Sequence, residues 1–293
     1  NLQVLKGSAA ITQGVATDLG SPGGVINLVT KTPKFYSGGE VGMRIGSYGQ
    51  ARTTYDVYTP VDHRGNLAFR LNGALETADS YRSKVSSDRM YINPSFLWKV
   101  DDKTQLILEM DYFNDARTPD LGTVNLAEID THAIYDMPHK QFLGFKNDRS
   151  LTKNTTFALR MDRKLSDQLE LKAAFYHSDL SLDDKGATMG RAVTQDGVTH
   201  YNLKNRGYSI ARRSDKNSVI QFDLIGDKVK TGSLLHTFQV GFDFRTNSYS
   251  TFTQTQSNVD VIDVFNPISN KLPTLNLSDP VEAAAESRSI GFV

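Results

Sequence analysis

The sequence of 293 residues contains no cysteine, which excludes a disulfide framework and cysteine-ligated metal sites. It has no excess of either charge: 33 basic residues balance 33 acidic ones, whereas a general nucleic-acid-binding surface needs a basic surplus. It also lacks any run approaching about 18 consecutive apolar residues, the minimum for a transmembrane helix. Strands are not excluded, because a membrane-spanning strand needs only about 9–11 residues, and alternate ones face lipid.

Alternation of apolar and polar residues is the main pattern from about Glu40 onward. Around Phe242, for example, every second residue is apolar and the intervening ones include Gln239, Asp243 and Arg245. Such a period of two predicts strands with one apolar and one polar face. We expect these strands near residues 39–47, 51–60, 67–77, 89–100, 105–114, 153–165, 168–180, 217–229 and 234–249, with a tenth beginning near residue 287.

The predicted connections are alternately short and long along the chain. The short ones lie near residues 62–66, 101–103, 166–167 and 230–232, and the long ones span about 78–87, 116–150, 182–217 and 250–286. Long loops without structure are uncommon in compact soluble domains, whereas outer-membrane barrels combine tight periplasmic turns with long extracellular loops. Because a barrel in lipid must close, we interpret nine or ten strands as a fragment of a larger barrel.

Aromatic residues near the predicted strand ends are consistent with the girdles of a membrane barrel. We expect six of them at strand ends or on the lipid face: Tyr91, Trp98, Tyr112, Phe113, Phe175 and Tyr176. The alternative is an ordinary β-sheet core.

A glycine- and proline-containing segment near the N-terminus is the most specific motif. It consists of Val4 to Ala10 (VLKGSAA) and Ser21 to Pro33 (SPGGVINLVTKTP), with the signature residues Gly7, Pro22, Gly23, Gly24, Asn27, Thr30 and Pro33. The two adjacent glycines permit a sharp turn, the residues after them can form a buried strand, and Pro33 ends its pairing.

This segment resembles the end of the plug domain in TonB-dependent siderophore receptors, where V-L-K/R-G-P is followed by P-G-G-V-I-N-L-V-T-K-x-P. The first half departs from that pattern, because Ser8 replaces the usual proline and Gln13 stands where a tyrosine is common. Two later segments are similar to loop motifs of the same family: residues 138–144 (PHKQFLG) and 264–267 (VFNP).

The resemblance implies an all-β fold in which a transmembrane antiparallel β-barrel follows a plug. Residues 1–36 are expected to be the C-terminal part of the plug domain, and residues 37–293 the N-terminal part of the barrel, about the first 9–10 of 22 strands. Inward-facing charges such as Arg70, Arg160 and Asp243 are expected to brace a hydrated barrel wall against the plug by ion pairs.

Candidate ligand contacts lie at the plug apex and in the extracellular loops, because aromatic faces and cations suit anionic chelates. They are Gln13, Ser21, Tyr48, Tyr81, Arg82, Tyr135 and His139. The six histidines show no metal-binding spacing, and no nucleophile with a base is recognisable, so we expect neither a protein-ligated metal nor an enzyme. Iron would be carried as a siderophore chelate, and no cofactor is expected.

The resemblance implies an outer-membrane receptor of a Gram-negative bacterium that imports a ferric siderophore. Its partners would be outer-membrane lipid and TonB, and TonB would be contacted through a segment expected to precede Asn1. No nucleic-acid partner is expected. The alternatives are import of another large ligand, such as a glycan, cobalamin or haem, by the same machinery, a passive porin or adhesin, and a soluble β-protein.

Overall fold

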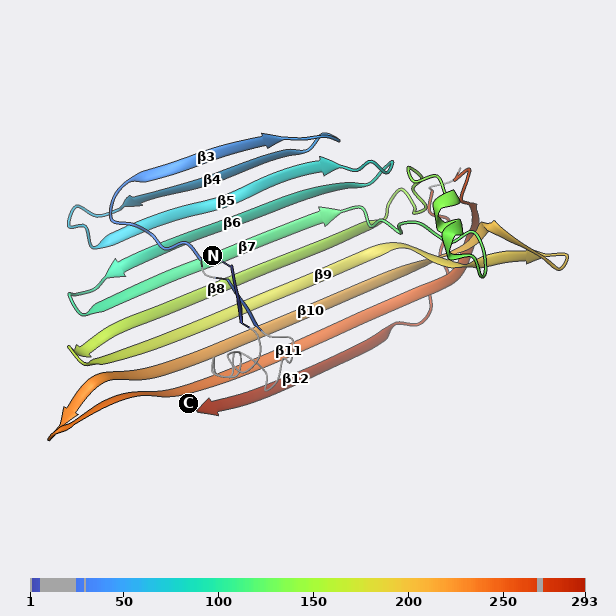
Figure 1. Cartoon of the computed structure of the whole chain (residues 1–293). Coiled ribbons are helices and arrows are strands. Elements are labelled where there is room, and N and C mark those ends of the chain that lie inside the picture. The colour runs from blue at the N-terminus through green and yellow to red at the C-terminus, as the bar shows by residue number, and fades with distance from the viewer. Residues whose placement is uncertain (1, 6–24, 29, 268–270, 293) are drawn as a thin grey trace.

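Ten of the described strands form one continuous antiparallel sheet whose order follows the chain from β3 to β12 (Figure 1). The computed structural model describes residues 2–5, 25–28, 30–267 and 271–292. The sheet contains β3 Gly38–Ile45, β4 Ala51–Pro60, β5 Leu67–Asp79, β6 Ser86–Lys99, β7 Thr104–Arg117, β8 Arg149–Ser166, β9 Leu169–Gln195, β10 Val198–Thr231, β11 Leu234–Asp263 and β12 Val281–Phe292.

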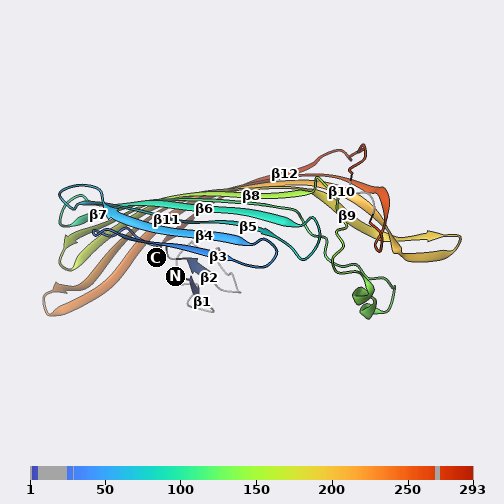
Figure 2. The ribbon, with the colours of Figure 1, turned by 90° about the horizontal axis from the view of Figure 1, so that it is seen from above.

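A separate two-stranded sheet lies on one side of this wall. It pairs β1 (Leu2–Leu5) with β2 (Val25–Leu28) in antiparallel register, so that Leu5 faces Val25. Figure 2 shows the large sheet as a curved wall with β1 and β2 on one side of it. We call this side the inner face, and the opposite side the outer face.

The two faces of the wall reverse the usual arrangement of a soluble protein. Large apolar side chains are exposed on the outer face, among them Val41, Leu75, Phe96, Trp98, Leu159, Phe222 and Val240. The inner face carries charged and polar side chains that are buried, including Arg70, Asn93, Glu109 and Asp243. This distribution confirms the faces expected from the alternation and fits a sheet whose outer face meets lipid.

Three of the six aromatic residues expected at strand ends or on the lipid face point inward. Tyr91 donates a hydrogen bond to Asp111 (2.5 Å), and Phe113 lies opposite Tyr91 in the strand register and therefore shares its face. Tyr176 lies opposite Ala158, in the same inward-facing row of β8 as Arg160. The phenol of Tyr91 explains its orientation, because its hydroxyl finds a hydrogen-bond partner on the polar inner face.

The predicted alternation of short and long connections is wrong, because residues 80–85 form a short turn and two of the other predicted long loops are mostly strand. β9 and β10 continue to a hairpin turn at Asp196 and Gly197, both at positive φ, where a loop over residues 182–217 was expected. β11 continues to Asp263, and β12 begins at Val281 rather than near residue 287. Polar residues occupy both faces here, and the period-two pattern fades.

Strand β6 contains a proline in the middle of its length, at residue 94. Pro94 pairs with Leu71 on β5, but the pairing of β6 with β7 is interrupted at residues 93 and 94. At this gap the side-chain Nδ2 of Asn93 donates to the main-chain oxygen of Met110 (3.0 Å). A side-chain donor thus replaces the backbone N–H that proline lacks.

The apolar cores of the described chain lie mainly in the long loops rather than on the sheet. One cluster joins Met137 and Leu143 of loop 118–148 to Ile262 and Val264. A second joins Phe145 to Ala187 and Tyr208 of the extended strands. Loop 118–148 also contains the short 3-10 helix η2 (Thr131–Asp136), which Figure 1 shows near the far ends of β9 and β10. Among the described residues, no helix has both the length and the apolar character needed to cross a membrane.

Candidate functional site

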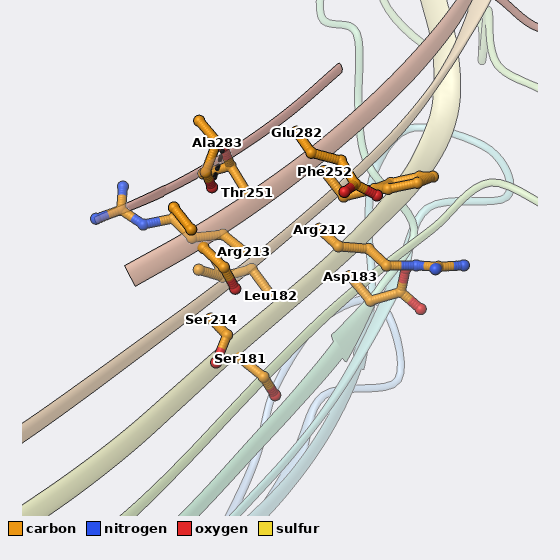
Figure 3. A pocket seen from close by; sticks show the side chains of 12 residues that line it. Ser181, Leu182, Asp183, Arg212, Arg213, Ser214, Thr251, Phe252, Glu282 and Ala283 are labelled. Carbon is orange, nitrogen blue, oxygen red and sulfur yellow. Dashed lines mark hydrogen bonds and ion pairs between the residues drawn. The ribbon is translucent and has the colours of Figure 1, made fainter. Parts of the chain in front are cut away.

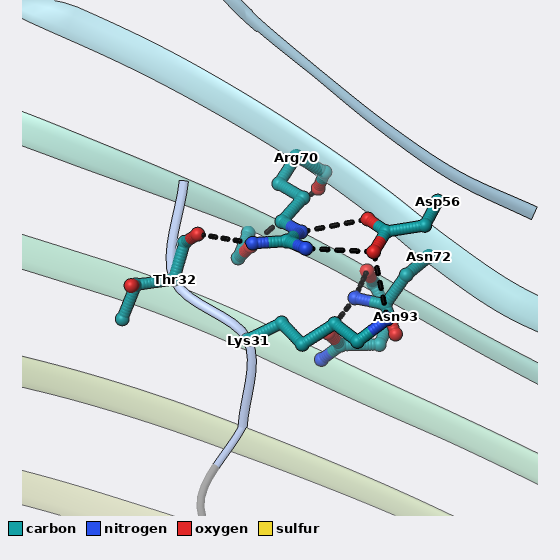
Figure 4. Close-up of polar contacts among 7 residues, drawn as sticks. Lys31, Thr32, Asp56, Arg70, Asn72 and Asn93 are labelled. Atoms are coloured by element: carbon teal, nitrogen blue, oxygen red, sulfur yellow. Dashed lines mark hydrogen bonds and ion pairs between the residues drawn. The ribbon is translucent and has the colours of Figure 1, made fainter. Parts of the chain in front are cut away.

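The first part of the candidate site is where the N-terminal segment is held on the inner face (Figure 4). Asp56 of β4 accepts two hydrogen bonds from the guanidinium of Arg70 on β5, at 2.7 and 2.6 Å. The same carboxylate accepts a third bond from Lys31 (2.7 Å), and Arg70 also donates to the main-chain oxygen of Thr32 (2.7 Å). A buried bidentate pair therefore holds two consecutive residues of the segment.

A second anchor lies one residue earlier in the segment and three strands further along the wall. The hydroxyl of Thr30 donates to Glu109 of β7 (2.7 Å), and Arg160 of β8 donates to the other carboxylate oxygen (2.5 Å). Together the anchors fix residues 30–32 across β4 to β8. The expectation that Arg70 and Arg160 belong to ion-paired wall contacts is thus confirmed.

The link from this segment to β3 is held by cations over aromatic rings. The ammonium of Lys34 lies 4.6 Å from the ring centroid of Tyr58 and 5.2 Å from that of Tyr36, and Lys99 lies 4.1 Å from that of Phe35. The side-chain hydrogen bond with Tyr36 raises the pKa of Lys34, and the same bond lowers the pKa of Tyr36.

The residues of the proposed plug signature are placed only in part. Gly7, Pro22, Gly23 and Gly24 lie outside the described residues. Asn27 lies in β2 opposite Gln3, Thr30 binds Glu109, and Pro33 is buried immediately before the link to β3. The assignment of residues 1–36 to a plug domain stays a prediction.

The second part of the candidate site is the cluster of long loops at the far end of the wall. Arg82 is buried, pairs with Asp120 (2.9 Å) and donates to the main-chain oxygen of Gln141 (2.8 Å). Its guanidinium therefore joins the β5–β6 turn to loop 118–148 instead of standing free in solvent. Tyr81 is exposed beside it, with its ring centroid 6.4 Å from that of His139.

The other candidate ligand contacts are more scattered. Tyr135 is exposed on η2, with its ring centroid 6.3 Å from that of His132, and Tyr48 is exposed in the β3–β4 turn at positive φ. Gln13 and Ser21 lie outside the described residues. The structure thus brings Tyr81, Arg82 and His139 together. Tyr48 lies beside the same turn, because its main-chain oxygen accepts from the amide of Asp79 (2.9 Å), whereas Tyr135 lies on η2.

The loop cluster is organised around an arginine that the sequence patterns do not single out. Arg206 of β10 is 1% exposed and donates to both carboxylate oxygens of Asp260 on β11, at 2.9 and 2.6 Å. It also donates to the main-chain oxygens of Leu143 and Gly144, at 3.0 and 3.1 Å, and stacks 3.7 Å from the centroid of Phe145.

Asp148 also connects loop 118–148 to the extended strand β9. Its Oδ2 accepts from the backbone amides of Phe145 (2.8 Å) and Ala187 (3.1 Å). Burial raises the pKa of this carboxyl group, although the two amides and Arg206 act in the opposite direction. The two loop motifs seen in the sequence meet here as well, because Leu143 packs with Val264 and Gln141 donates to the main-chain oxygen of Phe265 (3.0 Å).

Two depressions of similar size occur near this end of the wall. One, of about 580 Å³, crosses β9 to β12, and Figure 3 shows Arg212 and Arg213 pointing to opposite sides of it. Both arginines have carboxylate partners, Asp183 at 3.4 Å and Asp215 at 2.6 Å. The other, of about 590 Å³, lies between loop 118–148 and the β9–β10 hairpin. In the part of the chain that the structure describes, no cluster of three or more potential metal ligands occurs.

The relatives found by comparison with known proteins are receptors. The chain is 30% identical over 244 residues to the metal-pseudopaline receptor CntO of Pseudomonas aeruginosa, covering 83% of this chain and 32% of the relative. It is 28% identical over 284 residues to the ferrioxamine B receptor of Salmonella typhimurium, covering 93% and 38%. The chain thus spans about a third of the length of these relatives. No protein-family model matches the chain.

Solved structures agree in fold. The siderophore receptor PiuA from Acinetobacter baumannii superposes with a TM-score of 0.78 at 19% identity, covering 99% of this chain and 44% of that structure. The ferripyoverdine receptor of Pseudomonas aeruginosa superposes with a TM-score of 0.75 at 16% identity, covering 99% and 38%. The ten-stranded sheet therefore corresponds to part of the wall of such a receptor.

Proposed function

Because this chain belongs to the family of TonB-dependent siderophore receptors of the Gram-negative outer membrane, whose members are transporters and not enzymes, we propose that its protein imports a metal chelate. The chelate would be a ferric siderophore, bound from outside by the loop cluster. Transport would be energised through TonB from the inner membrane, since contact with TonB is a property of the family.

The observation that carries this proposal is the attachment of residues 30–32 to the inner face. Lys31 and Thr32 are held by the buried Asp56–Arg70 pair, and Thr30 is held by Glu109. Attachment of this segment to the inner face is consistent with a plugged lumen, and we propose that residues 1–36 form part of that plug. A plugged lumen gives a bulky chelate no passive route, so uptake needs an energy source.

A second candidate differs only in the ligand. The relatives include a metal-pseudopaline receptor at 30% identity and a ferrioxamine B receptor at 28% identity, so a metal-pseudopaline complex is the alternative ligand. The loop residues Tyr81, Tyr135 and His139 remain the proposed contacts in either case, because they present exposed or partly exposed rings. Tyr48 and the two apex residues Gln13 and Ser21 complete the proposed set, and Arg82 would position Tyr81.

The experiment is uptake of radiolabelled metal by cells that carry the full-length gene. It compares ferrioxamine B, catecholate siderophores and metal-pseudopaline, each with and without a working TonB system. Uptake of one chelate that is abolished without TonB is expected. Undiminished uptake without TonB would indicate a passive pore, and uptake of none of these chelates would refute the proposed ligand and leave the fold intact.

A further inference from the structure

The register of the small sheet sets the order in which a pull on the chain would open it. Leu2 lies opposite Leu28, and Leu5 lies opposite Val25. The end of β1 that leads to the N-terminus and the end of β2 that leads to the wall are therefore neighbours. Hydrogen bonds between antiparallel strands are perpendicular to the strands, so a force between these two ends loads the pairs one after another, starting at Leu2 and Leu28. Opening in this order meets little resistance, because the pairs do not resist together.

The small sheet has few pairs to hold it together. Each of its strands has four residues, and among the described strands β1 and β2 pair only with each other. An isolated two-stranded sheet is at best marginally stable in water. We therefore expect the pairing of β1 with β2 to yield first when the chain is pulled from the N-terminal side of Leu2.

Residues 30–35, here named the clamp segment, are attached to the wall by stronger contacts. The hydroxyl of Thr30 donates to the carboxylate of Glu109 (2.7 Å), and Arg70 donates to the main-chain oxygen of Thr32 (2.7 Å). Glu109 and Arg70 are 4% and 7% exposed, so water competes little for either bond. Hydrogen bonds with one ionised partner are about twice as strong as neutral ones. These bonds therefore hold the clamp segment more firmly than the neutral main-chain bonds hold β1 to β2.

An apolar socket in the polar inner face holds the same segment. The ring of Phe35 packs against Ala68, Leu97 and Ile107, which are at most 7% exposed. The ammonium of Lys99 lies 4.1 Å from the ring centroid. Withdrawing this ring would return apolar surface of both the ring and the socket to water, which opposes detachment. Because the socket and the polar anchors all lie within the clamp segment, a load on it is shared among them.

From this difference we propose that the clamp segment stays on the wall during uptake and that the moving part of the plug ends at residue 29. A pull from the N-terminal side separates β1 from β2, one pair after another, and stops at Thr30. The clamp segment thus limits how much of the chain leaves the inner face and keeps β2 in place for pairing again. This inference rests on the proposed uptake driven through TonB, because TonB supplies the pull.

Pulling a single full-length receptor in lipid by its N-terminus measures the clamp segment without any chelate. Once β1 separates from β2, the chain between Leu2 and Leu28 should lengthen by about 90 Å, at about 3.3–3.6 Å per residue. A second, higher force peak should follow when the clamp segment carries the load. Release of the chain past residue 36 in a single step, without a second peak, would overturn the inference.

Two substitutions should lower the second peak selectively. Thr30→Val removes the hydroxyl donor and leaves its acceptor in an ion pair, and Phe35→Ala empties the apolar socket. Made together, they should bring the second peak down to the height of the first, which should not change. The matched control, Thr251→Val with Phe252→Ala, makes the same chemical changes on β11 and should alter neither peak. A second peak that is equally high in both double variants would contradict the assignment.

Cysteine pairs connect the clamp segment to transport, since the sequence has no cysteine of its own. Gln3→Cys with Asn27→Cys places two thiols opposite each other, so that a disulfide keeps β1 paired with β2. Chelate uptake should fall about tenfold or more and return on reduction. Thr30→Cys with Glu109→Cys, joined by a short reducible bis-thiosulfonate linker, keeps the clamp segment on β7. Uptake should then stay within about twofold of the wild type.

The outcomes separate this inference from the proposed function. Uptake that survives the disulfide between β1 and β2 would overturn the inference. So would uptake that is lost when the clamp segment is linked to β7 and regained on reduction. Wild-type cells that import no chelate would refute the proposed function, and the force measurement would still decide whether the clamp segment holds.

Discussion

Replacing Arg206 with methionine should release loop 118–148 from the extended strands without unfolding the wall. The substitution removes a bidentate pair with Asp260, two bonds to main-chain oxygens and the stacking over Phe145. Breaking a fully buried pair costs about 3–5 kcal/mol. The side chain of Asp260 is 28% exposed and can be partly hydrated, so about 3 kcal/mol is the better expectation here.

The assay is amide hydrogen exchange of the full-length receptor in detergent or lipid. The amides of Phe145 and Ala187 are suitable reporters, because both donate to Asp148 inside the loop contact. A loss of about 3 kcal/mol corresponds to about a hundredfold fall in their protection, while amides in the middle of β5 to β8 should not change.

The control for this prediction is Arg212→Met on the same strand. Its side chain is 54% exposed and its contact with Asp183 is 3.4 Å long, so the pair should contribute only about 0–1 kcal/mol. If Arg206→Met leaves the protection of Phe145 within about twofold of the wild type, the reasoning that this arginine holds the loop is refuted.

Three further predictions concern pH, the lipid face and the N-terminal anchor. Burial raises the pKa of Asp148 in the folded loop, so the loop contact should be most stable at acidic pH and should weaken as pH rises through that raised pKa. Amide protection in the loop should show this pH dependence, and Asp148→Asn should abolish it. An unchanged pH profile in the variant would contradict the prediction. Phe242→Arg should cost the folded barrel about 2–4 kcal/mol in a lipid-refolding titration, whereas Asp243→Asn on the inner face should cost less, and equal costs would show that the faces are wrongly assigned. Arg70→Gln should raise amide hydrogen exchange of residues 30–32 about tenfold or more, since the pair with Asp56 and the bond to the segment are both lost; unchanged exchange would mean that this pair does not hold the segment.

The sequence predicts the lipid-facing part of the wall well, because lipid imposes a period of two. The run 51–60 coincides with β4, and the apolar alternation around Phe242 places β11 with the correct face outward. The same argument fails where the strands leave the lipid. Residues such as Arg212 to Lys216 are polar in succession, which is typical of a loop, yet their main chain pairs regularly with both neighbouring strands.

The candidate site is less predictable, because its contacts join residues far apart in the chain. Nothing near Arg206 distinguishes it from the other arginines of β10, and its partner Asp260 lies 54 residues later. Two family-like motifs provided the available signal. The segment at 138–144 and the segment at 264–267 do meet in the folded loops, through Leu143 and Val264. The motifs therefore marked two of the loop segments that meet, but neither their contact nor the side chain around which they assemble.

The interruption at Pro94 makes two neighbouring positions interdependent. The side chain of Asn93 donates to the Met110 oxygen in place of the backbone N–H that Pro94 lacks, so the effect of a substitution at one position depends on the residue at the other. Asn93→Ala alone would leave the main-chain oxygen of Met110 without a donor, and Pro94→Val alone would give that oxygen two competing donors. Made together, the two changes would restore an ordinary ladder. Variation at these positions should therefore be epistatic, with the double substitution tolerated better than the sum of the single ones.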